Sequence, residues 1–300
     1  MHNVTLHPRV LQDLCDYPAW RQYARLGLLI VLCWGLGWLS YTTSYIVASI
    51  FLAWCQGFLM VCCLVAAHDC AHDTFVKQRQ VCRILGAVIS APLLVNFSLY
   101  RYLHFTHHRL ANFPGDTQRP RTYTSVGHYL LAVLHWKFPF RFFQFSLFAF
   151  IGRYPDSVKT HKQRQAVLLD GIVLWLTLFM MIGFTIAFPK VMLWGYWLPV
   201  VCYLMLTFFL TTAEHTGCDM SKNAMKNARS VHAGPLFRFL FWQFNYHAEH
   251  HEYPTVPSSN LHRLYLLIGD QEQHPSDSYT CTHWAFILSI YQQRHKGRKI

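Results

Sequence analysis

Charged residues are scarce in this 300-residue sequence, and acidic residues are the scarcest. Only 13% of the residues are charged, with 14 Asp and Glu against 26 Lys and Arg, while 53% are hydrophobic. A soluble domain averages about 25% charged residues, so this composition indicates a membrane protein. The ten cysteines form no Cys-x-x-Cys pair and no framework of spacings. They are therefore interpreted as reduced, structural cysteines on a protein that faces the cytosol.

A cleavable signal peptide is not expected either. Residues 1–20 contain no apolar core and carry Pro8, Asp13, Asp16 and Pro18. The formal net charge is +12, and the basic residues flank the apolar runs. This arrangement favours contact with the anionic cytoplasmic leaflet over contact with nucleic acid, and an acidic redox partner is a second use for the same charge.

Apolar runs long enough to cross a bilayer occur four times, since a hydrocarbon core of about 30 Å needs roughly 20 helical residues. The expected spans are about residues 26–45, 46–67, 168–188 and 191–213. Lys190 is the basic residue of the outer turns, so the positive-inside rule predicts that both termini are cytoplasmic. The predicted fold is all-α and integral to the membrane, with four transmembrane helices, interfacial helices and a cytosolic helical cap. One domain covers residues 1–300, and the cap is formed mainly by residues 68–165 and 214–300.

Histidine is abundant and clustered. Nine of the 19 histidines form three clusters and one isolated site after the fourth apolar run: His68 and His72; His104, His107 and His108; His247, His250 and His251; and His215. Imidazole is a common metal ligand, and spacings of three and four residues bring side chains to one face of a helix. The predicted topology places all nine at the cytosolic boundary of the membrane. The other ten histidines occur singly and are interpreted as surface or interfacial residues.

Two less regular segments are interpreted in the light of this placement. Residues 84–100 are apolar but contain Pro92 and Asn96. As a span, this segment would separate the first two histidine clusters across the membrane, so an interfacial or re-entrant helix is preferred. Residues 136–154 combine many Phe with basic residues, which favours a helix in the interface, with a short buried helix as the alternative.

The number of imidazoles points to two metals, because one metal takes four to six ligands. Neutral imidazole suits zinc, copper, iron and nickel, so the ligand type alone does not select the metal. Carboxylates next to the histidines are candidates to accept the second ring N–H of a ligand, the alternative being solvated or helix-capping groups. These candidates are Asp69, Asp73, Glu214, Glu249 and Glu252.

The order and spacing of the clusters resemble a known family. The motifs are His68-x-x-x-His72, His104-x-x-His107-His108 and His247-x-x-His250-His251, with spans between the second and third. Over roughly residues 45–260 this pattern is similar to the integral-membrane fatty acid desaturase and hydroxylase superfamily. Glu252-Tyr253-Pro254 resembles the end of the third motif in that family, and His215 resembles an isolated ligand that some members place before it.

The resemblance implies a non-haem di-iron centre, with two iron ions (Fe2+/Fe3+) on the nine histidines and O2 as co-substrate. Electrons would come from a separate carrier, of the ferredoxin, rubredoxin or cytochrome b type, and its reductase, because a fused cytochrome b-type domain is not expected from this sequence. One position departs from the family. Animal stearoyl-type desaturases have an asparagine where this chain has Thr211, so a water-mediated Asn ligand is not implied.

The predicted function is O2-dependent desaturation of an acyl or acyl-like lipid chain at the boundary between membrane and cytosol. Oxidation of an unactivated C–H bond requires a redox metal, which the protein positions and shields. A hydroxylase or ketolase of a lipid, carotenoid, sterol or sphingoid chain could use the same site. A divalent-metal transporter would need ionisable groups near the bilayer centre, which the four runs lack. The expected partners are the lipid substrate, the bilayer and the electron carrier, with no nucleic acid.

Overall fold

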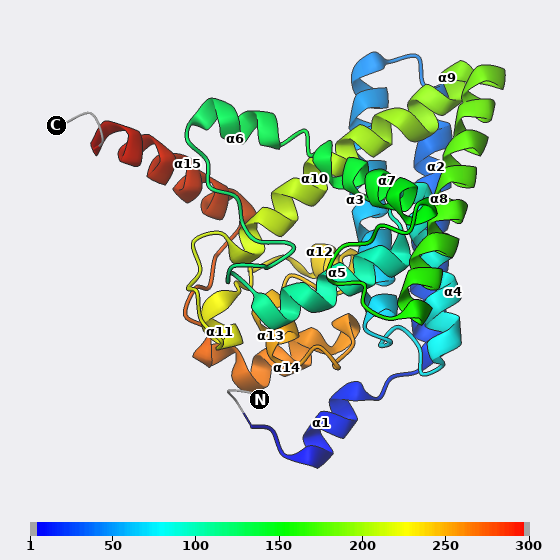
Figure 1. Cartoon of the computed structure of the whole chain (residues 1–300). Helices are drawn as coiled ribbons and strands as arrows, with labels where there is room; N and C mark the ends of the chain where they lie inside the picture. The colour runs from blue at the N-terminus through cyan, green and yellow to red at the C-terminus, as the bar shows by residue number, and fades with distance from the viewer. Residues whose placement is uncertain (1–4, 297–300) are drawn as a thin grey trace. The chain divides into compact units, whose positions relative to one another are not determined.

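Helices make up the ordered structure in the computed structural model, which describes residues 5–296 (Figure 1). Within that range no strand forms, and Val231 and Ser276 make a single isolated bridge. The predicted all-α class is therefore confirmed. The internal contacts divide the chain into two units. The first unit comprises residues 17–105 and 136–206, and the second comprises residues 5–16, 106–135 and 207–296. The single domain over residues 1–300 stays a prediction.

The first unit holds the long apolar helices. In chain order its elements are α2 (Ala19–Thr42), α3 (Ile46–Ala71), α4 (Arg79–Ser90), η1 (Ala91–Leu93), the start of α5 (Phe97–Leu110), α7 (Lys137–Phe150), α8 (His161–Ala187), α9 (Pro189–Met192), the π-helix η2 (Leu193–Trp197) and the start of α10 (Leu198–His215).

Shorter helices joined by loops make up the second unit. They are α1 (Pro8–Cys15), the end of α5, α6 (Val126–Ala132), the end of α10, α11 (Ala224–Asn227), α12 (Pro235–Leu240), α13 (His247–Glu252), η3 (Ser258–Asn260), α14 (Leu261–Ile268), η4 (Gly269–Gln271) and α15 (Tyr279–Lys296).

Four helical segments are long and apolar enough to cross a membrane: Ala19–Thr42, Ile46–Ala71, His161–Ala187 and Pro189–His215. They confirm the four predicted spans, but the helical boundaries differ. The second helix continues through His68 to Ala71, so this histidine lies in its last turn. Pro189 is the first residue of α9 instead of a turn residue, a position where proline costs no hydrogen bond.

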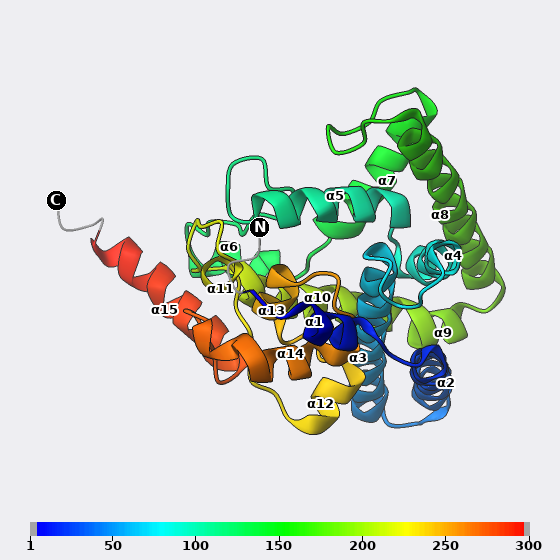
Figure 2. The same ribbon diagram turned by 90° about the horizontal axis from the view of Figure 1, so that it is seen from below.

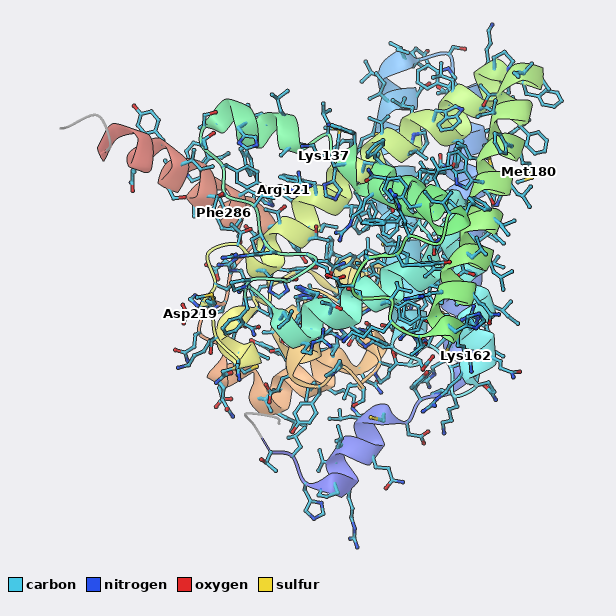
Figure 3. The ribbon with its side chains drawn as sticks, in the orientation of Figure 1. Arg121, Lys137, Lys162, Met180, Asp219 and Phe286 are labelled. Carbon is cyan, nitrogen blue, oxygen red and sulfur yellow. The ribbon has the colours of Figure 1, made fainter. Side chains whose placement is uncertain are left out.

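The outward faces of the span helices are apolar. Trp34 on α2 is 79% exposed and Ile186 on α8 is 79% exposed. Met180 also points outward from α8, and Lys162 lies at the opposite, N-terminal end of that helix (Figure 3). Exposed apolar surface of this extent is stable against lipid and unfavourable in water. Buried polar links lie on the inner faces, where Gln56 Nε2 donates to the carbonyl of Gly195 at 2.8 Å.

A sharp bend separates α4 and η1 from α5. The two arms, Arg79–Leu93 and Phe97–Leu110, meet at 100°, so the expected irregular segment is not one straight span. Leu94 in the bend adopts a left-handed backbone with φ of 62°. Asn96 fixes the bend, because its Nδ2 donates to Ser146 Oγ on α7 and to the carbonyl of Val167 on α8, each at 2.9 Å. These bonds set the direction of α5, which carries three of the clustered histidines.

Candidate metal centre

Four histidines of the second unit form one group. His107 comes from α5, His215 is the last residue of α10, and His247 and His251 are one turn apart on α13. One potential ligand atom of each lies within 4.8 Å of those of the other three. His215 Nε2 is the centre of the group, at 3.0 Å from both His107 Nε2 and His247 Nε2. Helix α13 is visible from below in Figure 2, close to α11, which it contacts.

In the rings of His107 and His215, the hydrogen bond of Nδ1 decides which nitrogen carries the proton. His107 Nδ1 donates to Asp116 Oδ1 at 2.8 Å, and His215 Nδ1 donates to the carbonyl of Asn227 at 2.8 Å. A neutral imidazole has one N–H, so both Nε2 atoms then present a lone pair. Two lone pairs at 3.0 Å repel each other unless a cation lies between them. This donor set therefore fits a metal ion.

The spacing of the nitrogens fits as well. A metal bound by imidazole nitrogen at about 2.1 Å places two ligands at a right angle about 3.0 Å apart. The 3.0 Å separations around His215 equal that value. Nε2 of His251 is buried with no hydrogen-bond partner among the residues described. Burial first, and then the nearby His215 and His247, hold the pKa of His251 well below its usual range, so this ring is neutral and able to ligate.

A second group of three lies in the first unit. His68 and His72 are one turn apart at the end of α3, and His104 is on α5. His104 Nε2 is 2.9 Å from both His68 Nε2 and His72 Nε2. A single ring nitrogen has either one proton or one lone pair, so it cannot make two full hydrogen bonds to both neighbours. The trio is therefore also a donor set suited to a cation.

The helix ends that present this trio are tied together. Asp73, just after α3, has a left-handed backbone with φ of 59°. Its two carboxylate oxygens accept from Arg101 Nη1 and Nη2 on α5, each at 2.8 Å. This bidentate pair restricts both the position and the rotation of α5 relative to the end of α3. Tyr100 stacks on His104 with ring planes 10° apart.

His108 and His250 form a pair within the second unit. Their Nε2 atoms are 3.1 Å apart. His108 also stacks on His251, with ring centroids 4.2 Å apart. Each of the nine predicted ligands thus has another clustered histidine as a neighbour inside its own unit.

A buried polar network holds α13. Ser230 Oγ donates to Glu249 Oε2 and accepts from the backbone N–H of Ala248 at 3.1 Å. The backbone N–H of Ser230 donates to Glu272 Oε1 at 2.5 Å. Burial raises the pKa of Glu249 to about 7 and that of Glu272 to about 8. The network fixes the turn that carries the third histidine cluster.

The five candidate carboxylates have different partners. Asp69 Oδ1 is 3.4 Å from His68 Nδ1, and Glu214 Oε2 is 3.6 Å from His247 Nε2. Asp73 pairs with Arg101 and Glu249 with Ser230. Glu252 is buried at the end of α13. Contact with a histidine ring is therefore observed for Asp69 and Glu214, at distances longer than a strong hydrogen bond.

Asp116 is the supporting residue that the sequence did not indicate. Besides His107 it accepts from the backbone N–H groups of Asn112 and Gln118. Burial opposes ionisation, but these three donors hold the pKa of Asp116 below its usual range. Nine residues separate Asp116 from His107, in a polar loop where Gly115-Asp116 gave only a turn signal. Whether Asp116 contacts His107 therefore depends on the path of that loop.

Comparisons with known proteins agree with the geometry. A family model described as "Fatty acid desaturase" matches residues 37–283, which include all nine clustered histidines. The chain is 24% identical over 321 residues to an sn-1 oleoyl-lipid 12-desaturase of Picosynechococcus sp., covering 96% of this chain and 87% of that protein. It is 25% identical over 281 residues to an sn-1 oleoyl-lipid 12-desaturase of Anabaena variabilis, covering 84% and 76%. It is 22% identical over 281 residues to "Fatty acid conjugase FAC2 B" of Calendula officinalis, covering 81% and 75%.

Proposed function

Because the chain belongs to the fatty acid desaturase family, we propose that it binds two iron ions on its nine clustered histidines and uses O2 to desaturate a membrane lipid. The protein is an integral membrane oxidoreductase of the desaturase type that acts on a lipid chain. Our proposal adds four features to this activity: the two irons, the complete ligand set, the electron carrier and the orientation of the termini.

The ligand assignment divides the histidines between two sites. His107, His215, His247 and His251 would hold the first iron, which the facing lone pairs and the 3.0 Å spacings support. His68, His72 and His104 would contribute to the second iron, which the 2.9 Å separations of their Nε2 atoms support. His108 and His250 complete the proposed set of nine ligands.

The overall reaction sets what the site must do. A saturated –CH2–CH2– unit, O2, two electrons and two protons give –CH=CH– and two waters, so O2 is reduced while the chain loses two hydrogens. Iron with open coordination positions supplies the O2 and C–H chemistry when bound.

The side chains around the ligands have separate tasks. Asp116 accepts the Nδ1 proton of His107, and the carbonyl of Asn227 accepts that of His215. The Nε2 lone pairs of both rings are therefore free to bind a metal. The ionised Asp116 also makes the ring of His107 a stronger donor to a metal. The Asp73–Arg101 pair keeps His72 and His104 in reach of each other. These contacts preorganise the ligands before metal and substrate bind.

The electrons come from a separate carrier under this proposal, of the ferredoxin, rubredoxin or cytochrome b type. The formal charge of +12 favours an acidic protein partner. With the basic segments on the inner side, both termini and the histidines face the cytoplasm. The lipid chain would then enter from the bilayer while electrons arrive from the cytosol.

Hydroxylation is the competing outcome on the same site, because the two reactions share C–H cleavage and differ only in the step after it. The curated relatives named as desaturases favour desaturation. The deciding experiment reconstitutes the full chain with carrier, reductase, O2 and phospholipids that bear saturated or monounsaturated chains. Mass spectrometry is expected to show a product with two fewer hydrogens. Product that gains oxygen and has no new double bond would contradict desaturation. His251→Ala should give no product, and His161→Ala, which changes an exposed single histidine, should behave as wild type.

A further inference from the structure

Two segments of the second unit, residues 109–121 and 216–227, are joined by one buried side chain. The first segment begins at the end of α5, and the other follows α10 and includes α11. Asn112 Nδ2 donates to the carbonyl of Asp219 at 3.0 Å and to the carbonyl of Asn227 at 2.8 Å. Asp219 marks the second segment in Figure 3. The two segments therefore form one continuous, defined surface.

The same segments provide the hydrogen-bond partners of two proposed metal ligands. His107 Nδ1 donates to Asp116, and His215 Nδ1 donates to the carbonyl of Asn227, each at 2.8 Å. The backbone N–H of Gln118, an exposed residue, donates to the same oxygen of Asp116 at 2.8 Å. Two hydrogen bonds thus connect an exposed residue to the ring of His107.

The charged side chains of these segments are mainly basic. Five Lys and Arg occur in them against two Asp. The side chain of Asp116 is buried, and Asp219 Oδ1 is 3.4 Å from His274 Nε2. Four exposed basic residues and one exposed methionine make up what we call the basic patch: Arg109, Arg119, Met220, Lys222 and Lys226.

Positions in the chain keep the basic patch next to the hydrogen bonds behind the metal ligands. Arg119 directly follows Gln118, and Lys226 directly precedes Asn227. Positive charge is therefore displayed at the surface within one residue of the groups that connect to the two rings.

We propose that the basic patch is the docking surface for an acidic electron carrier, and that electrons enter through the hydrogen bonds behind His107 and His215. This inference rests on the proposed function, because an O2-dependent reaction at iron is what requires a carrier. In each encounter the reduced carrier is oxidised by one electron, which passes to the metal pair. Two encounters supply the two electrons that the overall reaction consumes with O2.

The short path favours this surface, because the rate of electron transfer falls steeply as the distance between donor and acceptor grows. Redox partners also use small interfaces, typically below about 1,200 Å² in total. Met220, which is 59% exposed, provides an apolar contact among the charges. The surrounding Lys and Arg would steer an acidic partner toward it and raise the rate of encounter.

An anionic membrane surface and a second copy of the chain fit this surface less well. Met220 is the one large apolar side chain exposed among residues 109–121 and 216–227, all of which the structure describes. A segment that lies on a membrane needs an apolar face. Pairing two copies would bring two basic patches together, which like-charge repulsion opposes. An acidic protein neutralises the same charge.

Binding is tested without metal, so that the result does not depend on iron. The apoprotein in phosphatidylcholine nanodiscs is mixed in turn with three acidic carriers: a 2Fe–2S ferredoxin, a rubredoxin and a soluble cytochrome b domain. The reversal variant carries Arg109→Glu, Arg119→Glu, Lys222→Glu and Lys226→Glu. Its matched control makes the same change of charge at exposed residues of the first unit: Arg79→Glu, Arg153→Glu, Lys159→Glu and Lys162→Glu.

At least one carrier should bind the wild-type protein. At low ionic strength its association rate should fall about tenfold or more in the reversal variant, and much less in the control. High salt should remove the difference. Interchanging Lys and Arg at the same four positions should keep the wild-type rate. With iron bound, the ratio of carrier-driven to dithionite-driven turnover should fall in the reversal variant.

Failure of all three carriers to bind, or equal loss in the reversal variant and the control, would overturn the proposal. A reversal variant that keeps carrier binding but loses binding to phosphatidylglycerol vesicles, or loses dimers seen by cross-linking, would overturn it as well. Patch-dependent carrier binding to a protein that takes up no iron would contradict the proposed function and still support the docking surface.

Discussion

Asp116 Oδ1 accepts the Nδ1 proton of His107 at 2.8 Å, and this bond fixes which nitrogen of that ring can bind a metal. The same carboxylate accepts two backbone N–H groups of its own loop. It therefore couples the fold of residues 112–118 to the first proposed iron site. A ligand set can be complete in the sequence and still depend on such a residue.

Asp116→Asn should weaken that site. The amide can still accept a hydrogen bond, but it lacks the negative charge that strengthens the imidazole donor. Loss of such a supporting group typically lowers metal affinity or activity about 10- to 100-fold. Iron titration of the apoprotein, followed by turnover at saturating iron, measures the two effects. Asp219→Asn is the matched control because its side chain is more than half exposed. Equal iron affinity in both variants would refute the role of Asp116.

Ser230→Ala should destabilise the turn that carries α13. The change leaves the backbone N–H of Ala248 and one oxygen of Glu249 without their buried partner. An unsatisfied buried polar group costs about 1–3 kcal/mol. Thermal unfolding in detergent measures the loss, with Ser289→Ala on the exposed side of α15 as control. A melting temperature unchanged in Ser230→Ala would show that this network is not needed.

Gly57→Ala should disrupt the close approach of α3 and α10 in the first unit. A Cβ at residue 57 would lie 2.7 Å from Cys202 Cβ and 2.8 Å from the backbone N of Tyr203. Since a backbone atom cannot move aside, overpacking of about 1–3 kcal/mol is expected. Gly183→Ala on α8 meets nothing within 4 Å and should be neutral or slightly stabilising. Thermal unfolding of the two variants under the same conditions compares their stability. Similar melting temperatures would contradict the close packing of α3 against α10.

Glu272 should make the stability depend on pH. Burial raises the pKa of its carboxyl from 4.5 to about 8. The folded state therefore binds the proton more tightly than the unfolded state. The contribution of the protonated Glu272 carboxyl to the free energy of unfolding is complete below about pH 4.5 and is lost as the pH rises through about 8. Glu272→Gln keeps the oxygen that accepts from Ser230 and cannot ionise, so its melting temperature should fall less than that of wild type as the pH rises. The exposed Asp270→Asn is the control. Parallel curves for wild type and Glu272→Gln would exclude this ionisation.

Much of the architecture could be predicted from the sequence because hydropathy acts locally. The uncharged run before His68 is itself long enough to span a bilayer, and it forms α3. The i, i+4 spacings within the clusters also determine which rings share a helical face, as His68 and His72 do. The resemblance to desaturases rested on these spacings, and the family match over residues 37–283 confirms it.

Contacts between distant segments could not be derived in the same way. Asn96 binds α7 and α8, and Ser230 binds Glu249 and Glu272, through loops whose path no local pattern specifies. Asp73 was one of five candidate carboxylates, and its pairing with Arg101, 28 residues away, has no local signal in the sequence.

Iron content tests the central claim most directly. The full chain, purified aerobically with its lipid, should contain close to two irons. His251→Ala and His72→Ala should each lose about one, and His161→Ala should lose none. A protein that turns over with fewer than two irons, or variants at His251 and His72 that keep the full complement, would contradict the paired-metal site.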